Sequence, residues 1–456
     1  MDHDILALLG DVRSVAARPA FHIEQADHSE LTAYRTLRHE AFVSRQGLFT
    51  DHDLDEHDAD PRTVVLVARD AEGTVVGGVR LGPAEDGPDV GWWLGGRLVV
   101  APGTAPGVGS ALVRAACARA ENDGALRFEA TVQVRTERMF ARLGWQRVRP
   151  VTVAGTGHVL MRWPIGRIAA LARATKAALG PLLGGLTGVP GFLGDDGVPL
   201  PGTDVIAACD AIIPSMVERD PEWAGWCSVL VNVNDLAAMG ATPIGLLDAL
   251  GARDASFAAR VLSGLRKAST AYGVPVLGGH TQFGVPASLA VTALGRTADP
   301  VPGGGGQTGQ RVWLTADLRG QWRPGYTGRQ WDSTSSCRTP ELRELLGSVA
   351  RARPPAAKDV SMAGIAGTLG MLAEASGCGA ILDVEKVPRP RGVSTGDWLT
   401  CFPGYAMLTG GTPAPATGAS TSDCGELVPG EGVLLRWPDG ELTPALDGGV
   451  TGLGSS

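Results

Sequence analysis

Residues 226–251 read WCSVLVNVNDLAAMGATPIGLLDALG, and this stretch decides the fold of the larger part of the chain. Its apolar pattern predicts a helix over Pro221–Met239, a tight turn, and then a strand over Pro243–Gly251. Asn234 and Asp235 interrupt the apolar helix. An isolated buried carboxylate is costly, so we expect Asp235 to be paired or to face a cation, while a helix-terminal cap without chemistry is the alternative.

Further polar clusters interrupt apolar elements before and after this stretch. They are Gly194-Asp195-Asp196, Asp210, Gly278-Gly279-His280-Thr281 and Lys358-Asp359-Val360-Ser361. Several carboxylates together with amide or hydroxyl oxygens make a hard-oxygen site, for which Mg²⁺ is the natural ligand. The acidic residues alone fit calcium equally well, and the GDDG segment also fits a plain turn.

The order of these motifs from about residue 191 to the C-terminus resembles the AIR synthase (aminoimidazole ribonucleotide synthetase) superfamily, which includes thiamine-monophosphate kinase and selenophosphate synthetase. The resemblance implies ATP and Mg²⁺ bound between two α/β halves, and a homodimer formed through this part of the chain. It implies that Gly278, Gly279 and Thr281 form a phosphate loop. The full implied sets are, for metal or phosphate, Asp195, Asp196, Asp210, Asp235 and Asp359, and, for ATP, Gly278, Gly279, His280, Thr281 and Lys358.

Two departures separate this chain from the named members of that superfamily. The third motif is GGHT where the kinases and synthetases have GGDT or GGET, and a Cys/Lys active-site segment is missing before Gly194. We therefore expect an ATP-dependent protein of this superfamily that is none of its named members.

The segment Leu98–Ala120, LVVAPGTAPGVGSALVRAACARA, is the informative part of the first 160 residues. An apolar strand enters a Gly-rich loop that opens a helix, and the free N–H groups of a first helical turn suit a phosphate. Together with the later ATVQVRTERMFARLGWQRV, this segment resembles the GNAT acetyltransferase superfamily. The resemblance implies acetyl-CoA binding by Val99, Val100, Gly107, Val108, Gly109 and Ser110.

The acetyl-transfer chemistry is less well marked in the sequence. The usual Arg or Gln of the loop is Thr104, and the frequent Tyr general acid is Phe140, which has no proton to donate. Glu129 and His158 are the candidates for the general base or the general acid. A solvated strand position for Glu129 and a structural role for His158 are the alternatives.

Composition bounds the remaining possibilities. The chain has 456 residues, 44% hydrophobic and 19% charged, with a net charge of −8, which argues against nucleic-acid binding through a broad basic surface. Seven scattered Cys without CxxC spacing fit a reducing cytoplasm, and no apolar run is long enough for a membrane span. The start, MDHDILALLGDVRS, is not a signal peptide.

These observations predict an α/β (α+β) protein in four parts: a GNAT mixed-sheet domain over 1–164, a helical linker over 165–190, and AIR synthase-like halves over 191–300 and 301–456. We expect a bifunctional enzyme that joins an acetyl-CoA-dependent N-acetyltransferase to an Mg-ATP-dependent activity on a small nitrogenous metabolite. The fusion resembles a nitrogen-starvation acetyltransferase joined to an AIR synthase-like partner. The alternative is an acetyltransferase with a non-catalytic nucleotide-binding regulatory module.

Overall fold

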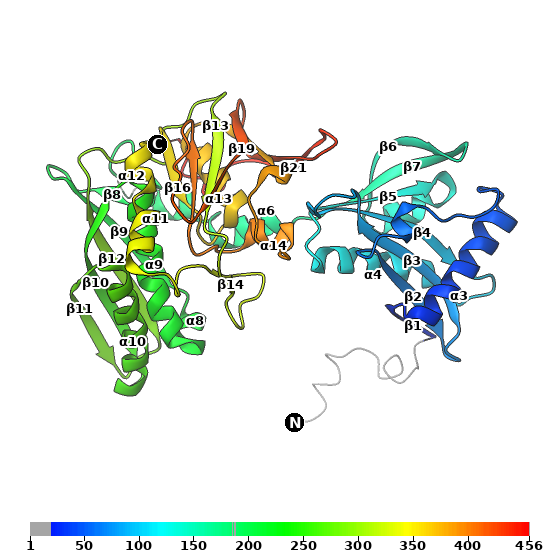
Figure 1. Ribbon diagram of the computed structural model, residues 1–456, viewed down its shortest axis with the longest axis horizontal. Coiled ribbons are helices and arrows are strands. Elements are labelled where there is room, and N and C mark those ends of the chain that lie inside the picture. The colour runs from blue at the N-terminus through cyan, green and yellow to red at the C-terminus, as the bar shows by residue number, and fades with distance from the viewer. Residues whose placement is uncertain (1–19, 185, 187, 456) are drawn as a thin grey trace. The chain divides into compact units, whose positions relative to one another are not determined.

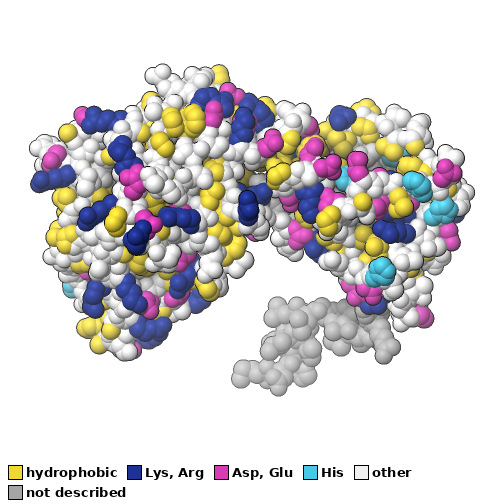
Figure 2. Space-filling view, in the orientation of Figure 1, with side chains coloured by type: hydrophobic (Ala, Val, Ile, Leu, Met, Phe, Trp, Pro, Cys, Tyr) yellow, Lys and Arg dark blue, Asp and Glu magenta, His cyan; other side chains and the backbone are white. Residues whose placement is uncertain are grey.

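The computed structural model describes residues 20–184, 186 and 188–455. The N-terminal stretch Met1–Ser14 and residues 185 and 187 of the predicted linker therefore lie outside the described residues. The chain divides into two compact units, Met1–Ile165 and Gly166–Ser456, which are described separately (Figure 1). On the face drawn in Figure 2, basic and acidic side chains are interspersed over both units.

The first unit is built on a seven-stranded sheet in the order β1-β2-β3-β4-β5-β7-β6 (Figure 1). Neighbouring strands pair antiparallel except β4 and β5, which are parallel. The strands are β1 (Phe21–Gln25), β2 (Val64–Asp70), β3 (Val75–Pro83), β4 (Trp92–Val100), β5 (Arg127–Gln133), β6 (Gln146–Val153) and β7 (Thr156–Trp163).

Strand β2 shows why helices cover both faces of this sheet. Val64 and Leu66 belong to the apolar cluster that includes α4 (Val108–Asn122), whereas Val65 and Val67 pack with Tyr34 of α3 (His28–Arg38). Alternate residues of a strand point to opposite faces, so a strand that is apolar throughout needs cover on both sides. The short helix α5 (Glu137–Arg142) follows β5.

The sequence pattern predicts one helix over His28–Ser44, but α3 does not continue as an α-helix over this whole range. It ends at Arg38 and is followed by a π-helical turn over His39–Arg45. The α-helix begins with a capping box, in which the side chain of Asp27 accepts from the N–H of Glu30 at 2.8 Å.

The first half of the second unit contains a five-stranded sheet in the order β11-β10-β12-β9-β8. Helices α9 and α10 belong to the apolar core of this half, together with the inward-facing residues of the sheet. The elements are β8 (Val198–Pro199), β9 (Val205–Ile212), α8 (Pro214–Arg219), α9 (Pro221–Ala238), β10 (Thr242–Ala252), α10 (Ala255–Tyr272), β11 (Val276–Phe283) and β12 (Ser288–Arg296).

Helix α9 is buried on nearly all sides, and its polar residues connect neighbouring elements. Asn232 donates to the carbonyl of Ser228 at 2.9 Å and accepts from the N–H of Asp210 in β9. Asn234 donates to the carbonyl of Gly404 at 2.8 Å. Hydrogen bonding of this kind is what makes polar residues tolerable in a buried helix.

The second half of this unit contains a seven-stranded sheet in the order β16-β18-β13-β19-β17-β20-β21, on which α13 packs. Its elements are β13 (Arg311–Ala316), β14 (Gln321–Trp322), β15 (Trp331–Asp332), α11 (Thr339–Leu346), α12 (Ser348–Ala352), β16 (Ala356–Asp359), α13 (Gly364–Ala375), β17 (Gly379–Asp383), α14 (Thr395–Thr400), β18 (Ala406–Gly410), β19 (Ser420–Val428), β20 (Val433–Arg436) and β21 (Leu442–Leu446).

The predicted linker contains two short helices, α6 (Arg167–Thr175) and α7 (Leu179–Leu183). Helix α6 packs on α13 and α14, and Arg167 donates to Asp397 at 2.6 Å. This helix is therefore part of the second unit. Among the helices of the described residues, none has the length and apolarity that a membrane crossing requires.

Candidate functional sites

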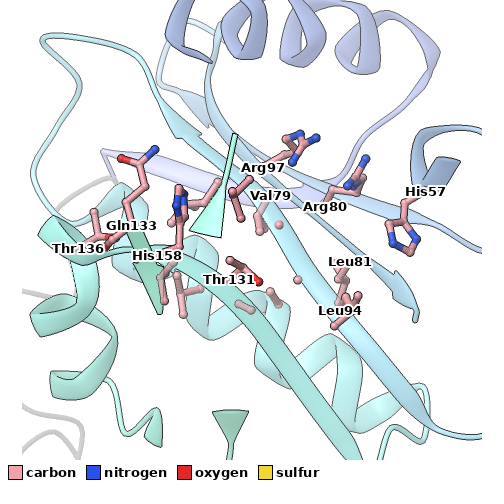
Figure 3. A pocket seen from close by; sticks show the side chains of 18 of the residues that line it. His57, Val79, Arg80, Leu81, Leu94, Arg97, Thr131, Gln133, Thr136 and His158 are labelled. Atoms are coloured by element: carbon pink, nitrogen blue, oxygen red, sulfur yellow. The ribbon is translucent and has the colours of Figure 1, made fainter. Parts of the chain in front are cut away.

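The first unit has a cleft of about 400 Å³ between β4 and β5 (Figure 3). The two strands pair only from Trp92 opposite Arg127 to Gly95 opposite Ala130, although both continue further. The backbone groups that face each other beyond these residues are therefore open to a ligand. An extended, amide-bearing ligand can bind such an open strand edge.

Arg97 lies where the two strands separate. Its φ of +53° is uncommon for a residue with a side chain, and the β3–β4 register shifts between Gly78 and Arg80. This bulge bends β4 away from β5. The Tyr34 hydroxyl donates to the Arg97 carbonyl at 2.8 Å and so holds the bulge to α3.

The predicted acetyl-CoA loop leads into the first turn of α4. Gly107 has a φ of +94°, and Ala111 is the first residue whose N–H bonds back, to the Gly107 carbonyl at 2.9 Å. The N–H groups of Val108, Gly109 and Ser110 have no partner within the helix, as in any first turn. Val99 and Val100 end β4 immediately before this loop.

Glu129 and His158 have different environments. Glu129 is buried and accepts from Trp92 Nε1 at 3.0 Å and from Arg162 Nε at 2.9 Å, and it is also paired with Arg127 at 3.0 Å. His158 lines the cleft, where Figure 3 shows it opposite Arg97, and its Nδ1 lies 2.9 Å from the Thr156 carbonyl.

The partner of His158 decides which of its nitrogens faces a ligand. A carbonyl only accepts, so Nδ1 carries the proton and Nε2 keeps its lone pair. His158 is therefore able to accept a proton, whereas the oxygens of Glu129 already bind three side chains.

A closed ring of alternating Arg and Asp residues borders the cleft. Each Arg bridges two Asp residues: Arg38 binds Asp53 at 2.7 Å and Asp58 at 2.6 Å, and Arg80 binds Asp58 at 2.6 Å and Asp55 at 2.8 Å. Arg97 completes the ring through Asp55 at 2.9 Å and Asp53 at 3.3 Å.

The ring was not predicted from the sequence. Its acidic members lie in the segment Asp53–Asp58, which reads as a polar loop, and its basic members lie on three separate elements. The motif HDLDEHD offered a signal of clustered acids, but not the identity of their partners.

In the second unit, three carboxylates from distant parts of the chain converge. Oxygen atoms of Asp196, Asp235 and Asp359 all lie within 4.8 Å of one another. Asp196 follows a turn, Asp235 lies on α9, and Asp359 ends β16. Burial, and then the neighbouring carboxylates, raise the pKa of both Asp235 and Asp359 well above the usual value.

Lys358 and Asp195 border this cluster. The buried Lys358 ammonium donates to Asp196 at 3.0 Å and to the Gly194 carbonyl at 3.0 Å, and it lies 3.7 Å from Asp195. Burial raises the pKa of Asp195 to about 6, although Lys358 opposes the rise. Burial alone lowers the pKa of Lys358, but Asp196 and Asp195 outweigh it and raise that pKa.

Several buried oxygens in this site have no hydrogen-bond partner within the described residues. They are Asp359 Oδ2, Asp195 Oδ1 and Asn234 Oδ1. Asp210 is close enough for its charge to raise the pKa of Asp235 and Asp359. Unpartnered buried acceptors beside a group of carboxylates are the donor set that a hard divalent cation completes.

The remaining residues that were predicted to bind ATP do not lie in the loop that the sequence analysis predicts. The sequence pattern predicts a strand over Val274–Leu277, but β11 extends to Phe283, so Gly278, Gly279, His280 and Thr281 lie inside this strand and not in a loop. All four are exposed at the edge of their sheet. Across the described residues, no hydrogen bond or ion pair joins them to the carboxylate cluster.

Comparison with family models assigns three segments. Residues 28–145 match the Acetyltransferase (GNAT) family, residues 194–297 the AIR synthase related protein N-terminal domain, and residues 338–413 the AIR synthase related protein C-terminal domain. These three matches agree with the resemblances drawn from the sequence.

Among known sequences, an uncharacterized protein of Synechocystis sp. is 39% identical over 224 residues, which cover 47% of this chain and 69% of the relative. An uncharacterized protein of Methanocaldococcus jannaschii is 31% identical, over 41% of this chain and 59% of the relative. The thiamine-monophosphate kinase of Caulobacter vibrioides is 26% identical, over 55% of this chain and 82% of the kinase.

Solved structures give related matches. Thiamine monophosphate kinase from Aquifex aeolicus matches 55% of this chain and 92% of its own, with 20% identity and a TM-score of 0.42. T. maritima PurL complexed with ATP matches 64% of this chain and 49% of its own, with 16% identity and a TM-score of 0.45.

Proposed function

Because the chain belongs to the AIR synthase related family and carries a GNAT acetyltransferase domain in front of it, we propose that it is a bifunctional enzyme. One activity is an acetyl-CoA-dependent N-acetyltransferase. The other is an Mg-ATP-dependent activity of the kinase or ligase type. Both act on one small nitrogenous metabolite, in successive steps.

The cleft between β4 and β5 carries the first proposal. Its open strand edges suit the amide-bearing arm of acetyl-CoA, which supplies an acetyl thioester. The backbone of Val99 and Val100 leads to the first turn of α4, where Val108, Gly109 and Ser110 offer free N–H groups to the pyrophosphate. The helix dipole adds to this attraction.

His158 is the general base of this proposal, and Glu129 is not. His158 Nε2 takes a proton from the acceptor ammonium, and the freed amine attacks the thioester carbonyl. The C–N bond forms as the C–S bond breaks, and a second proton of the nitrogen passes to the departing thiolate through solvent, since Phe140 has none to give, while the third stays on the amide nitrogen. Coenzyme A and an N-acetyl amide are the products.

Thiol release from acetyl-CoA, measured across a library of amines and amino acids, tests the transferase. His158→Gln keeps a donor near the Thr156 carbonyl but removes the basic nitrogen, so we expect at least a 100-fold loss of kcat with little change in acetyl-CoA affinity. His22→Gln is the matched control, because His22 is half exposed on β1. The absence of a thermal shift at millimolar acetyl-CoA would contradict the proposal.

The unpartnered Asp359 oxygen beside Asp196 and Asp235 carries the second proposal. These three carboxylates fit Mg²⁺, with Asp195 and Asp210 nearby for a second ion or for ordered water. When bound, the ion would offset the charge of a nucleotide's phosphates. Lys358 holds Asp196 in place and adds one positive charge to the site.

Titration of a non-hydrolysable ATP analogue, with and without Mg²⁺, tests this site. We expect binding only with the cation. Turnover is measured as ATP consumption across the same metabolite library. Nucleotide binding without consumption of ATP on any candidate would favour the regulatory module over the enzyme.

We further propose a homodimer through the first half of the second unit. Every residue of β11 is exposed, including Leu277 at 58% and Phe283 at 56%, and the outer edge of the strand is unpaired. An open, apolar edge strand is prone to pair with another chain. Light scattering should give a dimer mass, and Leu277→Lys should shift it toward the monomer. A wild-type monomer at micromolar concentration would contradict this proposal.

A further inference from the structure

Arg97 combines two features that the acetyl-transfer reaction does not use. It lines the cleft, and Figure 3 shows its guanidinium on the same side of the cavity as Arg80. Its φ of +53° is a strained conformation for a non-glycine residue. Backbone strain of this kind costs on the order of 1–3 kcal/mol and persists where the surrounding structure enforces it.

The ring leaves Arg97 incompletely paired. Arg38 uses all three of its nitrogens on Asp53 and Asp58. Arg97 uses Nε on the Asp53 carbonyl and Nη2 on Asp55, both at 2.9 Å, while its Nη1 has no partner among the described residues. The Arg97 side chain is 18% exposed and lines the cleft, and its guanidinium lies over the ring of Phe49, another lining residue, at 5.0 Å from the ring centre.

The directions of the pKa shifts of Arg97 and Arg80 agree with the incomplete pairing of Arg97. Burial lowers the pKa of Arg97 despite Asp55, whereas the Asp55 and Asp58 carboxylates raise the pKa of Arg80 against its burial. Arg97 is therefore the cation of the ring that would gain most from a further anion.

The other charges of the cleft indicate which ligands it favours. Asp55 is the only carboxylate among its described lining residues, and Arg80 and Arg97 both bind it. The lining residues also include Arg135, in the turn after β5, and the apolar side chains of Leu81 and Leu94. A second ammonium on the acceptor would have no unpaired carboxylate to bind among these lining residues, whereas a carboxylate on the acceptor could bind Arg97.

We propose that Arg97 binds a carboxylate of the acetyl acceptor, so that the acceptor is an amino acid-like compound: a primary amine with a carboxylate and an apolar side chain. This inference rests on the proposed acetyltransferase. The guanidinium holds the carboxylate, the apolar lining residues receive the side chain, and the amine is left directed toward His158. Arg97 is a specificity-determining residue in this arrangement.

Binding of product analogues tests the inference without requiring turnover. The full chain, saturated with coenzyme A, is titrated with N-acetyl-leucine and with N-isopentylacetamide, which differ only in the carboxylate. N-acetylglycine and N-methylacetamide form a smaller second pair. Since a charge-assisted bond contributes about 1.5–3 kcal/mol, we expect each acid to bind roughly 10- to 100-fold more tightly than its amide partner.

Arg97→Gly is the decisive variant, because glycine adopts the positive φ without strain and the backbone bulge is preserved. We expect it to remove the preference for the acid in both pairs. Ala154→Gly is the matched control: Ala154 also has a positive φ, of +46°, but is exposed in the β6–β7 turn, and this variant should keep the full preference.

Three outcomes would overturn the inference: equal binding of acid and amide by the wild type, a preference that survives in Arg97→Gly, or no binding of either pair at millimolar concentration. Isopentylamine acetylated as efficiently as leucine would also overturn it while supporting the transferase. A clear preference for the acids without any acetyl transfer would instead support carboxylate binding by Arg97 but remove the transferase, and with it the role of that ligand as the acetyl acceptor.

Discussion

The backbone N–H of Asp359 donates to the Asp196 carboxylate at 3.0 Å, although 163 positions separate the two residues. This bond joins the turn at the start of the second unit to the end of β16. Gly303 N–H makes a similar bond to Asp195 at 2.9 Å. The acidic turn is thus positioned by the second half of its unit, and the three carboxylates converge only when both halves are folded.

The carboxylate cluster predicts opposite effects of one substitution on stability and on binding. Asp235→Asn removes a buried acid that lies against Asp359, so without metal we expect the free energy of unfolding to rise by about 1–3 kcal/mol. The same change should weaken Mg²⁺-dependent nucleotide binding by at least roughly 30-fold, since one of three anionic ligands is lost. Thermal unfolding with and without Mg-ATP measures both effects.

Asp204→Asn is the matched control, because Asp204 is exposed at the start of β9. It should change neither quantity. If Asp235→Asn bound Mg-nucleotide as tightly as the wild type, the metal site would have to lie elsewhere.

The Arg–Asp ring predicts a large loss of stability in the first unit. Arg38 is fully buried, and Arg38→Met leaves Asp53 and Asp58 each without one of its partners. Breaking a buried ion pair from one side costs about 3–5 kcal/mol. We expect a lower urea midpoint and faster hydrogen exchange at residues 53–58.

Arg45→Met controls for loss of an exposed arginine, because Arg45 donates only to the Glu40 carbonyl. Equal urea midpoints for the two variants would show that the ring contributes little. Burial raises the pKa of Asp58, but bonds from Arg38 and the charge of Arg80 outweigh it and hold that pKa well below the usual 3.8. The ring's stabilisation should therefore be complete above pH 4 and fall only in stronger acid.

Glu374 predicts a pH-dependent attachment of the C-terminal segment. Its carboxylate accepts from the N–H groups of Val450 at 2.7 Å, Thr451 at 2.8 Å and Gly452 at 2.8 Å. Burial raises its pKa, but these backbone donors outweigh burial and lower it below the usual 4.5. The stabilisation is thus fully present above pH 4.5 and is lost as the pH falls through the lowered value.

Hydrogen exchange at residues 450–454 measures this attachment. Glu374→Gln should raise the exchange rates at pH 7 by roughly 10-fold, because a neutral amide oxygen is a weaker acceptor than a carboxylate. Glu431→Gln is the comparison, because Glu431 is exposed and makes no hydrogen bond to residues 450–454 among the described residues. Unchanged protection in Glu374→Gln would mean that packing, and not the carboxylate, holds the segment.

The contact between α9 and α10 predicts that a usually favourable substitution is harmful. Alanine is about 1 kcal/mol better than glycine in a free helix. A Cβ on Gly264, however, would overlap the carbonyl of Glu222, and one on Gly225 would overlap that of Val261. We therefore expect Gly264→Ala to lower the free energy of unfolding by about 1–3 kcal/mol. Ser256→Ala, on the exposed side of α10, should not lower it.

The two families and most long helices could be predicted from the sequence because their signals are local. The helix expected over Pro221–Met239 begins at Pro221 and ends at Ala238. The family assignments depended on motif order, which folding does not alter. No comparable local signal in the sequence indicates that the first helix changes from α3 to a π-helical turn.

Three-dimensional partners explain what the sequence could not reveal. Glu129 was a candidate because its strand was expected to line the cleft, but Arg127 and Arg162 bind its carboxylate oxygens. The GGHT motif has the composition of a loop, yet pairing with β10 makes it a strand. Arg97 looked like an ordinary strand residue, because neither its positive φ nor its incomplete pairing can be predicted from neighbouring residues. The metal, phosphate and acetyl-CoA roles of the other candidates stay predictions.

The negative charge of the carboxylate cluster would affect the order in which a cation and a nucleotide bind. Asp195, Asp196, Asp210, Asp235 and Asp359 form a group of five acidic residues, against which Lys358 supplies one buried ammonium and Lys176 a second positive charge that acts on Asp210 and Asp359. A nucleotide stripped of its cation would bring further negative charge into a region already rich in it. In the proposed Mg-ATP site, the cation would therefore enter with the nucleotide or before it, and a chelator should prevent nucleotide binding altogether instead of only slowing turnover.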